Sequence, residues 1–132
     1  METNELRIGN YLFDDETNDI MIVSRIETEE YTEWNSGNEF NIICLKNGFN
    51  KTYFEGNFRP IPLTEDILLK CGFKKELDAF YRKNKSQMIE VCFHDNGILI
   101  TNQSVCLSSI KYLHQLQNLY FALTNQELTI TL

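Results

Sequence analysis

Long apolar runs are missing from this chain of 132 residues. None approaches the roughly 20 residues that a membrane-spanning helix needs, so the sequence predicts no such helix. The N-terminal segment METNELRIGN has neither a basic nor an apolar stretch, so it is not a secretory signal. The content of 42% hydrophobic and 23% charged residues is that of an ordinary folded domain, and we expect a cytoplasmic protein.

Recognisable catalytic motifs are also missing. The sequence has no glycine-rich phosphate loop of the Walker type, and neither histidine stands beside a serine, cysteine or carboxylate in a known motif. The acidic turn at residues 14–16 offers carboxylates to a hard cation, although a lone acidic turn is usually only solvated. We therefore expect that the protein is not an enzyme and binds no cofactor.

Paired cysteines are missing as well. The four cysteines form no CxxC pair and stand among apolar neighbours, which is typical of buried free thiols in a reducing compartment. Cys92 and His94 would share a strand face, but two ligands do not make a zinc site, and we expect no metal. The cysteines are Cys44, Cys71, Cys92 and Cys106.

Basic residues are nearly missing from the first third of the chain. Residues 1–39 hold 11 acids and 2 bases, a net charge of −9, whereas residues 40–132 hold 8 acids and 10 bases, a net charge of +2. The total of −7 therefore arises in the first third.

The acidic segment at residues 27–39 (ETEEYTEWNSGNE) is the strongest candidate for a partner-binding surface. It contains the only tryptophan and no base. Aromatic side chains can anchor a protein contact while carboxylates steer the encounter with a basic surface. The alternative is a solvated hairpin whose tryptophan folds back onto the domain. The predicted partner-binding residues are Glu27, Glu29, Glu30, Tyr31, Glu33 and Trp34.

A second candidate comprises basic and aromatic residues between positions 70 and 85. Basic groups beside aromatic rings can bind a nucleic-acid backbone and stack on bases. Glu76 and Asp78 interrupt the patch, and the overall acidity opposes non-specific binding to nucleic acid. The alternative is an ordinary charged helix end and hairpin. The residues of this candidate are Lys74, Lys75, Arg82, Lys83 and Lys85.

Residues 1–62 predict short strands separated by turns. Apolar and polar residues alternate in several segments, with turn-forming Gly, Asn and Asp between them. Strands at this spacing are typical of a small meander, and we predict an SH3-like antiparallel barrel. The expected strands are 6–13, 20–28, 40–45, 50–54 and 58–63.

Residues 63–132 predict a helix–hairpin–helix–strand unit packed against the barrel and sharing its core. Thr64 is a good N-cap for a first helix, and Gly72 can end it. The long helix at 109–123 is amphipathic, with Leu116 in its apolar stripe and His114 flanking the stripe. The fold class is therefore α+β. The expected strands are 80–81, 88–93, 98–101, 105–107 and 128–132.

Three stretches of the chain carry a resemblance to a known group of proteins. They are LRIGNYLF at 6–13, IPLTEDILLKCGF at 61–73 and IKYLHQLQNLYFALTNQEL at 110–128. In these stretches the chain resembles small phage- and prophage-associated proteins of Bacteroidetes-type bacteria, a group with no catalytic motif to carry over. The resemblance implies a small cytoplasmic accessory protein associated with mobile elements.

Charge, missing chemistry and the resemblance lead to one functional hypothesis. We expect a non-enzymatic acidic protein-binding module of mobile-element origin that inhibits a host defence nucleoprotein such as a CRISPR nuclease, in the manner of an anti-CRISPR protein. Its expected partner is a basic surface of a host protein or ribonucleoprotein. The alternative is a nucleic-acid-binding accessory module that uses residues 70–85, and a phage structural or assembly part is a third interpretation.

Overall fold

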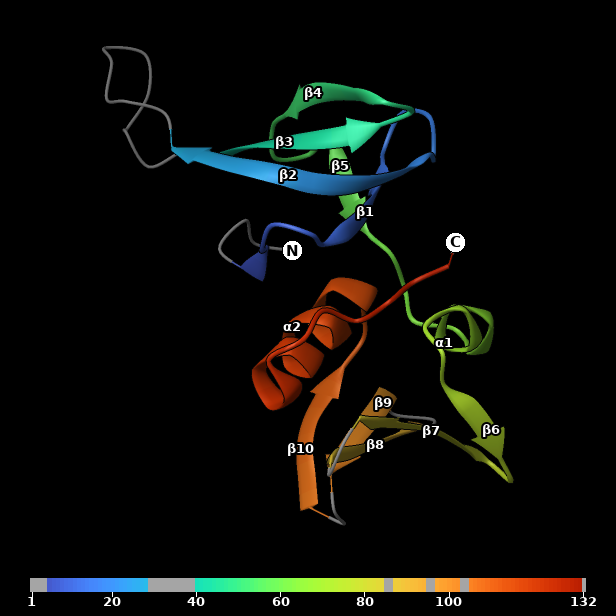
Figure 1. Ribbon diagram of the computed structural model, residues 1–132. Coiled ribbons are helices and arrows are strands. Elements are labelled where there is room, and N and C mark those ends of the chain that lie inside the picture. The colour runs from blue at the N-terminus through green and yellow to red at the C-terminus, as the bar shows by residue number, and fades with distance from the viewer. Residues whose placement is uncertain (1–4, 29–39, 85–86, 95–96, 103–104, 132) are drawn as a thin grey trace. The chain divides into compact units, whose positions relative to one another are not determined.

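The computed structural model describes residues 5–28, 40–84, 87–94, 97–102 and 105–131. The described part contains two antiparallel sheets and two short helices (Figure 1), which confirms the predicted α+β class. The chain divides into two compact units, Met1–Ile61 and Pro62–Leu132. Neither helix among the described residues has the length and the apolar surface that a membrane span requires.

The first unit is built on one five-stranded sheet. Its strand order is β4-β3-β2-β1-β5, so four strands form a meander and β5 returns to pair with β1. No pairing joins β4 to β5 among the described residues, so the predicted closure into a barrel is not seen there. The strands are β1 (Tyr11–Asp14), β2 (Ile20–Thr28), β3 (Phe40–Lys46), β4 (Phe49–Tyr53) and β5 (Phe58–Pro60).

The first strand begins later than its apolar pattern predicts. Gly9 has a φ of +96°, and the amide of Asn10 donates to the carbonyl of Arg7 at 3.1 Å, so residues 7–10 form a turn. The regular ladder with β2 begins at Tyr11, although the amide of Gly9 already donates to the carbonyl of Val23 at 2.8 Å.

One face of this sheet carries the core of the first unit. Side chains alternate along each strand, and the ladders place Leu12 opposite Met21 and Val23 opposite Cys44. The buried cluster consists of Leu6, Leu12, Met21, Val23, Ile42, Cys44, Tyr53 and Phe58.

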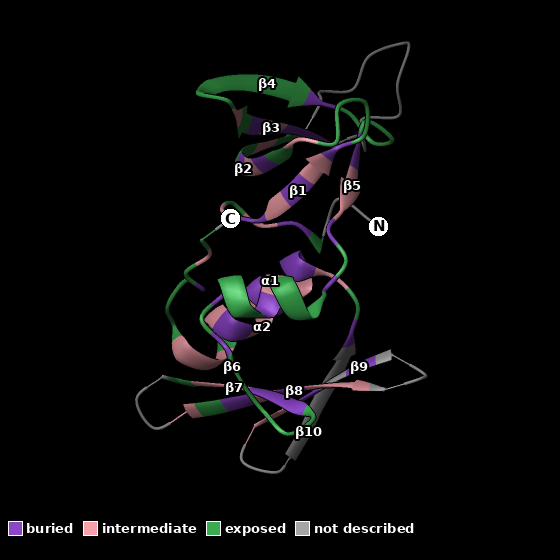
Figure 2. Ribbon diagram, turned by 90° about the vertical axis from the view of Figure 1, so that its right-hand side faces the viewer, coloured by how far each residue is buried: buried purple, intermediate pink, exposed green. Residues whose placement is uncertain are grey.

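The second unit consists, in chain order, of a helix, a meander of five strands and a second helix. The strand order is β10-β9-β8-β7-β6, and both helices lie on the same side of the sheet (Figures 1 and 2). The expected single hairpin is therefore part of a larger sheet. The elements are α1 (Glu65–Lys70), β6 (Lys74–Glu76), β7 (Ala79–Asn84), β8 (Gln87–His94), β9 (Gly97–Asn102), β10 (Val105–Ile110) and α2 (Leu113–Thr124).

The second helix starts four residues later than predicted, at Leu113 rather than at residue 109. Strand β10 runs on to Ile110, and Tyr112, in extended conformation, forms an isolated bridge with Pro62. The Gln115 side-chain oxygen accepts the amide of Tyr112 at 3.1 Å, which satisfies a free donor at the helix start.

The final strand that the sequence predicts at 128–132 is wrong, because the residues described there do not form a strand. Residues 128–131 have no strand partner, although the amide of Thr131 donates to the carbonyl of Lys70 at 2.9 Å. Leu128 is nevertheless buried.

The core of the second unit includes Leu116 and His114 of the long helix. Leu116 is fully buried, as its place in the apolar stripe predicts, and Thr64 caps α1 by accepting the amide of Ile67 at 3.2 Å. His114, which we expect to flank the stripe, is fully buried, and its ring stacks on Tyr112 at a centroid distance of 5.9 Å.

Candidate functional site

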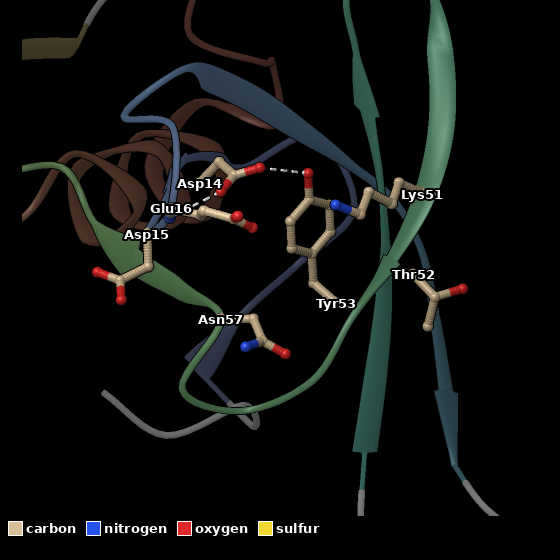
Figure 3. A pocket seen from close by; sticks show the side chains of 7 residues that line it. All are labelled: Asp14, Asp15, Glu16, Lys51, Thr52, Tyr53 and Asn57. Carbon is tan, nitrogen blue, oxygen red and sulfur yellow. Dashed lines mark hydrogen bonds between the residues drawn. The ribbon is translucent and has the colours of Figure 1, made fainter.

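A polar pocket of about 440 Å³ opens in the first unit between two turns. One turn links β1 to β2 and the other links β4 to β5, so the sheet brings together residues that are far apart in the chain. The lining residues, drawn in Figure 3, are Asp14, Asp15, Glu16, Lys51, Thr52, Tyr53 and Asn57.

Asp14 is buried because of its place in β1. It lies two residues after Leu12, so both side chains point to the core face of the sheet. Only 2% of its surface is exposed. A carboxylate in such a position needs several hydrogen bonds, since burying an unpaired charge is very costly.

Four hydrogen bonds satisfy the Asp14 carboxylate. Oδ1 accepts the backbone amides of Glu16 at 2.9 Å and Thr17 at 3.2 Å, which shapes the turn after β1. Oδ2 accepts the Tyr53 hydroxyl at 2.7 Å, drawn as a dashed line in Figure 3, and the Lys46 ammonium at 2.9 Å. These bonds use most of the capacity of a carboxylate for accepting hydrogen bonds.

Lys46 extends this network across the turn. Its ammonium also donates to the hydroxyl of Thr17 at 2.9 Å and pairs with Asp19 at 3.3 Å. The end of β3 is thereby tied to the turn between β1 and β2, which forms one side of the pocket.

The network fixes the charge state of its members. The hydrogen bond from Lys46 holds the pKa of Asp14 well below its usual range, although burial acts in the opposite direction. The bond to Asp14 raises the pKa of Lys46. Burial, with the charge of Asp14, raises the pKa of Tyr53 to about 12. At neutral pH the site therefore holds a carboxylate, an ammonium and a neutral phenol, and Asp14 is too weak a base for acid–base catalysis.

The outer part of the pocket is less constrained. Asp15 pairs with Arg59 at 3.4 Å, and the Lys51 ammonium lies 5.3 Å from the centroid of the Tyr53 ring. Figure 3 shows the Tyr53 hydroxyl directed at the carboxylate of Asp14. The three lining carboxylates are matched in number by the cations Lys46, Arg59 and Lys51, so the pocket is polar without a clear excess of negative charge.

The cysteines with described side chains are not set up as nucleophiles. Burial raises the pKa of Cys44 to about 12 and that of Cys71 to about 11. Cys92 is half-buried and donates to the Glu90 carboxylate at 3.1 Å, and burial together with this contact raises its pKa to about 11. Among the residues that the structure describes, no three His, Cys, Asp or Glu side chains form a group that could hold a metal ion.

Only one of the predicted partner-binding residues falls within the described part. Glu27 lies near the end of β2, is exposed, and pairs with Arg25 at 2.9 Å. The others lie outside the described residues: Glu29, Glu30, Tyr31, Glu33 and Trp34.

The predicted basic residues do not form one surface. Lys74 and Lys83 lie on one face of the second sheet and Lys75 and Arg82 on the other, because neighbouring residues of a strand point in opposite directions. Lys85 lies outside the described residues.

Two of these bases are already engaged within the second unit. Arg82 turns inward, donates to the carbonyl of Cys71 at 2.7 Å and lies over the ring of Tyr120. Lys75 pairs with Glu65 at 3.4 Å. The structure therefore separates the bases that the sequence places close together.

The buried network is the feature that the sequence interpretation missed. The turn after β1 was expected to be solvated, whereas Asp14 binds Lys46 and Tyr53. The sequence does contain one signal for the burial of Asp14: it lies two residues after the apolar Leu12, so on a strand both side chains point to the same face.

No protein-family model, curated protein or solved structure matches this chain.

Proposed function

We propose that this chain is a non-enzymatic acidic protein-binding module of mobile-element origin. Its partner is a basic surface of a host protein or ribonucleoprotein, and a defence nucleoprotein such as a CRISPR nuclease is the concrete target. Binding there would occupy a surface that normally holds nucleic acid, and would inhibit the host protein.

The observation that carries this proposal is the place of the acidic segment in the first sheet. Strand β2 is the longest of the described strands, and its ladder with β3 continues until Thr28 pairs with Phe40. The segment at residues 29–39 thus connects two strands whose ends are held side by side. Because Thr28 and Phe40 are paired, the segment begins and ends at the same end of the β2–β3 ladder, which supports a role in contacting a partner.

Charge within the first unit supports the same partner chemistry. Three of its basic residues already form ion pairs with carboxylates of the same unit. They are Arg25, Lys46 and Arg59. Acids outnumber bases by 11 to 2 in residues 1–39. A surface of this sign accelerates encounter with a basic protein and opposes binding of free nucleic acid.

The proposal includes an SH3-like fold for the first unit. A four-stranded meander whose fifth strand returns to pair with β1 is the strand order of small SH3-like barrels, and β5 follows β4 after a short turn. Backbone NOEs between β4 and β5 would establish closure. Their absence, with all other ladders intact, would leave an open sheet.

The proposal also places the protein in the bacterial cytoplasm. Cys44, Cys71 and Cys92 are free thiols, which agrees with a reducing compartment.

A tagged pull-down from a Bacteroidetes-type host, after nuclease treatment, tests the proposal. The wild type is compared with a variant in which Glu29, Glu30 and Glu33 are changed to lysine. The matched control changes three exposed acids elsewhere to lysine: Glu55, Glu65 and Asp66. We expect the wild type and the control to capture the same basic protein and the segment variant to lose it. Equal capture by all three would contradict the proposal.

Gel shifts at low salt separate this function from nucleic-acid binding. We expect the purified protein to shift neither RNA nor DNA. A shift that weakens steeply with salt, and that is lost when Lys74 and Lys83 are changed to glutamate, would favour the nucleic-acid-binding alternative instead.

A further inference from the structure

The turn between β6 and β7 exposes a leucine. Glu76 pairs with Ala79, so the hairpin is closed by two residues, Leu77 and Asp78. The side chain of Leu77 is 95% exposed, the highest value among the large apolar residues described, and its φ is +56°.

Neither the backbone nor the core explains a leucine at this position. The other described residues with positive φ, apart from glycines, are asparagines at 18, 47 and 125. Asparagine tolerates this left-handed conformation, whereas the Cβ of leucine crowds the following carbonyl. The side chain also gains nothing from burial within its own unit. An exposed and strained apolar residue of this kind indicates a contact surface.

Acidic side chains flank the exposed leucine. Glu76 and Asp78 are both exposed, on either side of Leu77. We define Glu76, Leu77 and Asp78 as the acidic tip. A complementary surface would be an apolar hollow with a basic rim.

The second unit itself contains such a hollow. A pocket of about 540 Å³ lies where the end of α1 meets β7 and the C-terminal segment. We define it as the basic-rimmed pocket. It is lined by Leu69, Lys70, Gly72, Arg82, Thr129 and Thr131.

The basic-rimmed pocket combines an apolar wall with two cations. Leu69 is 52% exposed and forms the apolar wall. The Arg82 guanidinium is held in place by the carbonyl of Cys71 and by the hydroxyl of Tyr120, at 2.7 and 3.2 Å. The Lys70 ammonium pairs with Asp66 at 3.0 Å, and an exposed pair of this kind is easily exchanged.

Gly72 makes room for the Arg82 guanidinium in the basic-rimmed pocket. Its φ is +84°, and a Cβ at this position would collide with the guanidinium of Arg82. The arginine can cross the glycine closely only because no side chain is present there.

We propose that the acidic tip of one copy of this chain inserts Leu77 into the basic-rimmed pocket of a second copy. Leu77 then packs on Leu69, while Glu76 and Asp78 face Lys70 and Arg82. The contact is heterologous, because tip and pocket are different surfaces, so each copy can both give and receive it. This self-association is independent of the acidic segment at 27–39 and goes beyond the protein-binding function proposed above.

A contact through one small tip is weak and depends on concentration, since stable interfaces bury far more surface. Sedimentation velocity from micromolar to millimolar protein is therefore the appropriate measurement. We expect the average mass to rise above the monomer mass of 15.5 kDa, and to fall back as salt is added.

Two variants remove the two halves of the contact. Leu77→Asn removes the apolar tip and suits the left-handed backbone, whereas Leu69→Glu removes the apolar wall and adds a charge that repels the tip. Each variant alone should stay monomeric over the whole range. The matched control, Leu45→Glu, alters another exposed leucine in the first unit and should associate like the wild type.

Mixing the two monomeric variants gives the decisive result. Leu69→Glu still carries the tip and Leu77→Asn still carries the pocket, so an equimolar mixture should form a one-to-one complex and nothing larger. A wild type that stays monomeric at all concentrations would overturn the proposal. So would association of Leu77→Asn equal to that of the wild type, or a mixture that remains monomeric while both variants melt like folded protein.

Discussion

The hydroxyl of Tyr53 donates a 2.7 Å hydrogen bond to the carboxylate of Asp14, although the two residues are 39 positions apart in the chain. This bond joins the end of β4 to the end of β1 across the core face of the first sheet. Lys46 binds the same carboxylate oxygen at 2.9 Å. The first unit is thus held at one end by a buried polar network as well as by apolar packing.

Removing the hydroxyl tests this bond directly. Tyr53→Phe should lower the free energy of unfolding by about 1.5–3 kcal/mol, because a hydrogen bond to a charged, buried acceptor is lost. Urea denaturation measures the change. Tyr81→Phe, at a half-buried tyrosine of the second sheet, is the control and should change stability by less than about 0.5 kcal/mol. Equal effects of the two substitutions would show that the bond to Asp14 is not special.

The lowered pKa of Asp14 predicts an acid-labile contribution to stability. A carboxyl whose folded-state pKa is depressed stabilises the fold above its unfolded pKa of about 4, and loses that contribution as pH falls. The wild type should therefore exceed Asp14→Asn in unfolding free energy at pH 7, and the gap should narrow below about pH 4. A gap that is constant from pH 7 to the acid limit would exclude an ionised Asp14 as its source.

Leu116 should be among the most sensitive positions of the second unit. It is fully buried, so Leu116→Ala should reduce the free energy of unfolding by about 2–5 kcal/mol. Leu69→Ala is the matched control, since that leucine of α1 is 52% exposed. Thermal melting of both variants measures the difference, and a melting curve unchanged by Leu116→Ala would refute its placement in the core.

Leu77 should be replaceable with a gain in stability. Asparagine suits a φ of +56° better than leucine does, so Leu77→Asn should stabilise the monomer by about 0.5–1 kcal/mol. The measurement is urea denaturation at micromolar protein, where self-association contributes little. A loss of stability would mean that the leucine serves the fold.

Local patterns in the sequence predicted the fold class and most strands. Alternation placed strands over 20–28 and 88–93, and helical spacing placed Leu116 in the core. These features depend on neighbouring residues, which one sequence contains in full.

Features that depend on distant residues could not be predicted in this way. The acidic turn after β1 looked solvated because its partner Lys46 lies 32 positions away. The long helix starts late because Tyr112 forms a bridge with Pro62. The C-terminal segment is joined to the end of α1 by the hydrogen bond from the Thr131 amide to the carbonyl of Lys70. The pairing register that divides the basic residues between two faces is likewise a property of the folded sheet.

The candidate sites also differ in whether local sequence or the folded structure reveals them. Composition located the acidic segment, of which the structure describes Glu27 as an exposed residue near the end of β2. Composition could not locate the acidic tip, because the exposure of Leu77 and its left-handed backbone follow from the hairpin between β6 and β7.

We propose that acids of the 27–39 segment bind a basic protein partner. The decisive measurement is the affinity of the captured partner, purified free of nucleic acid, for the wild type and for the variant in which Glu29, Glu30 and Glu33 are lysine. We expect the dissociation constant to rise at least about tenfold, a loss of about 1.4 kcal/mol, while the control with Glu55, Glu65 and Asp66 changed to lysine binds like the wild type. Equal affinities for the wild type and the segment variant, with both folded, would contradict the claim.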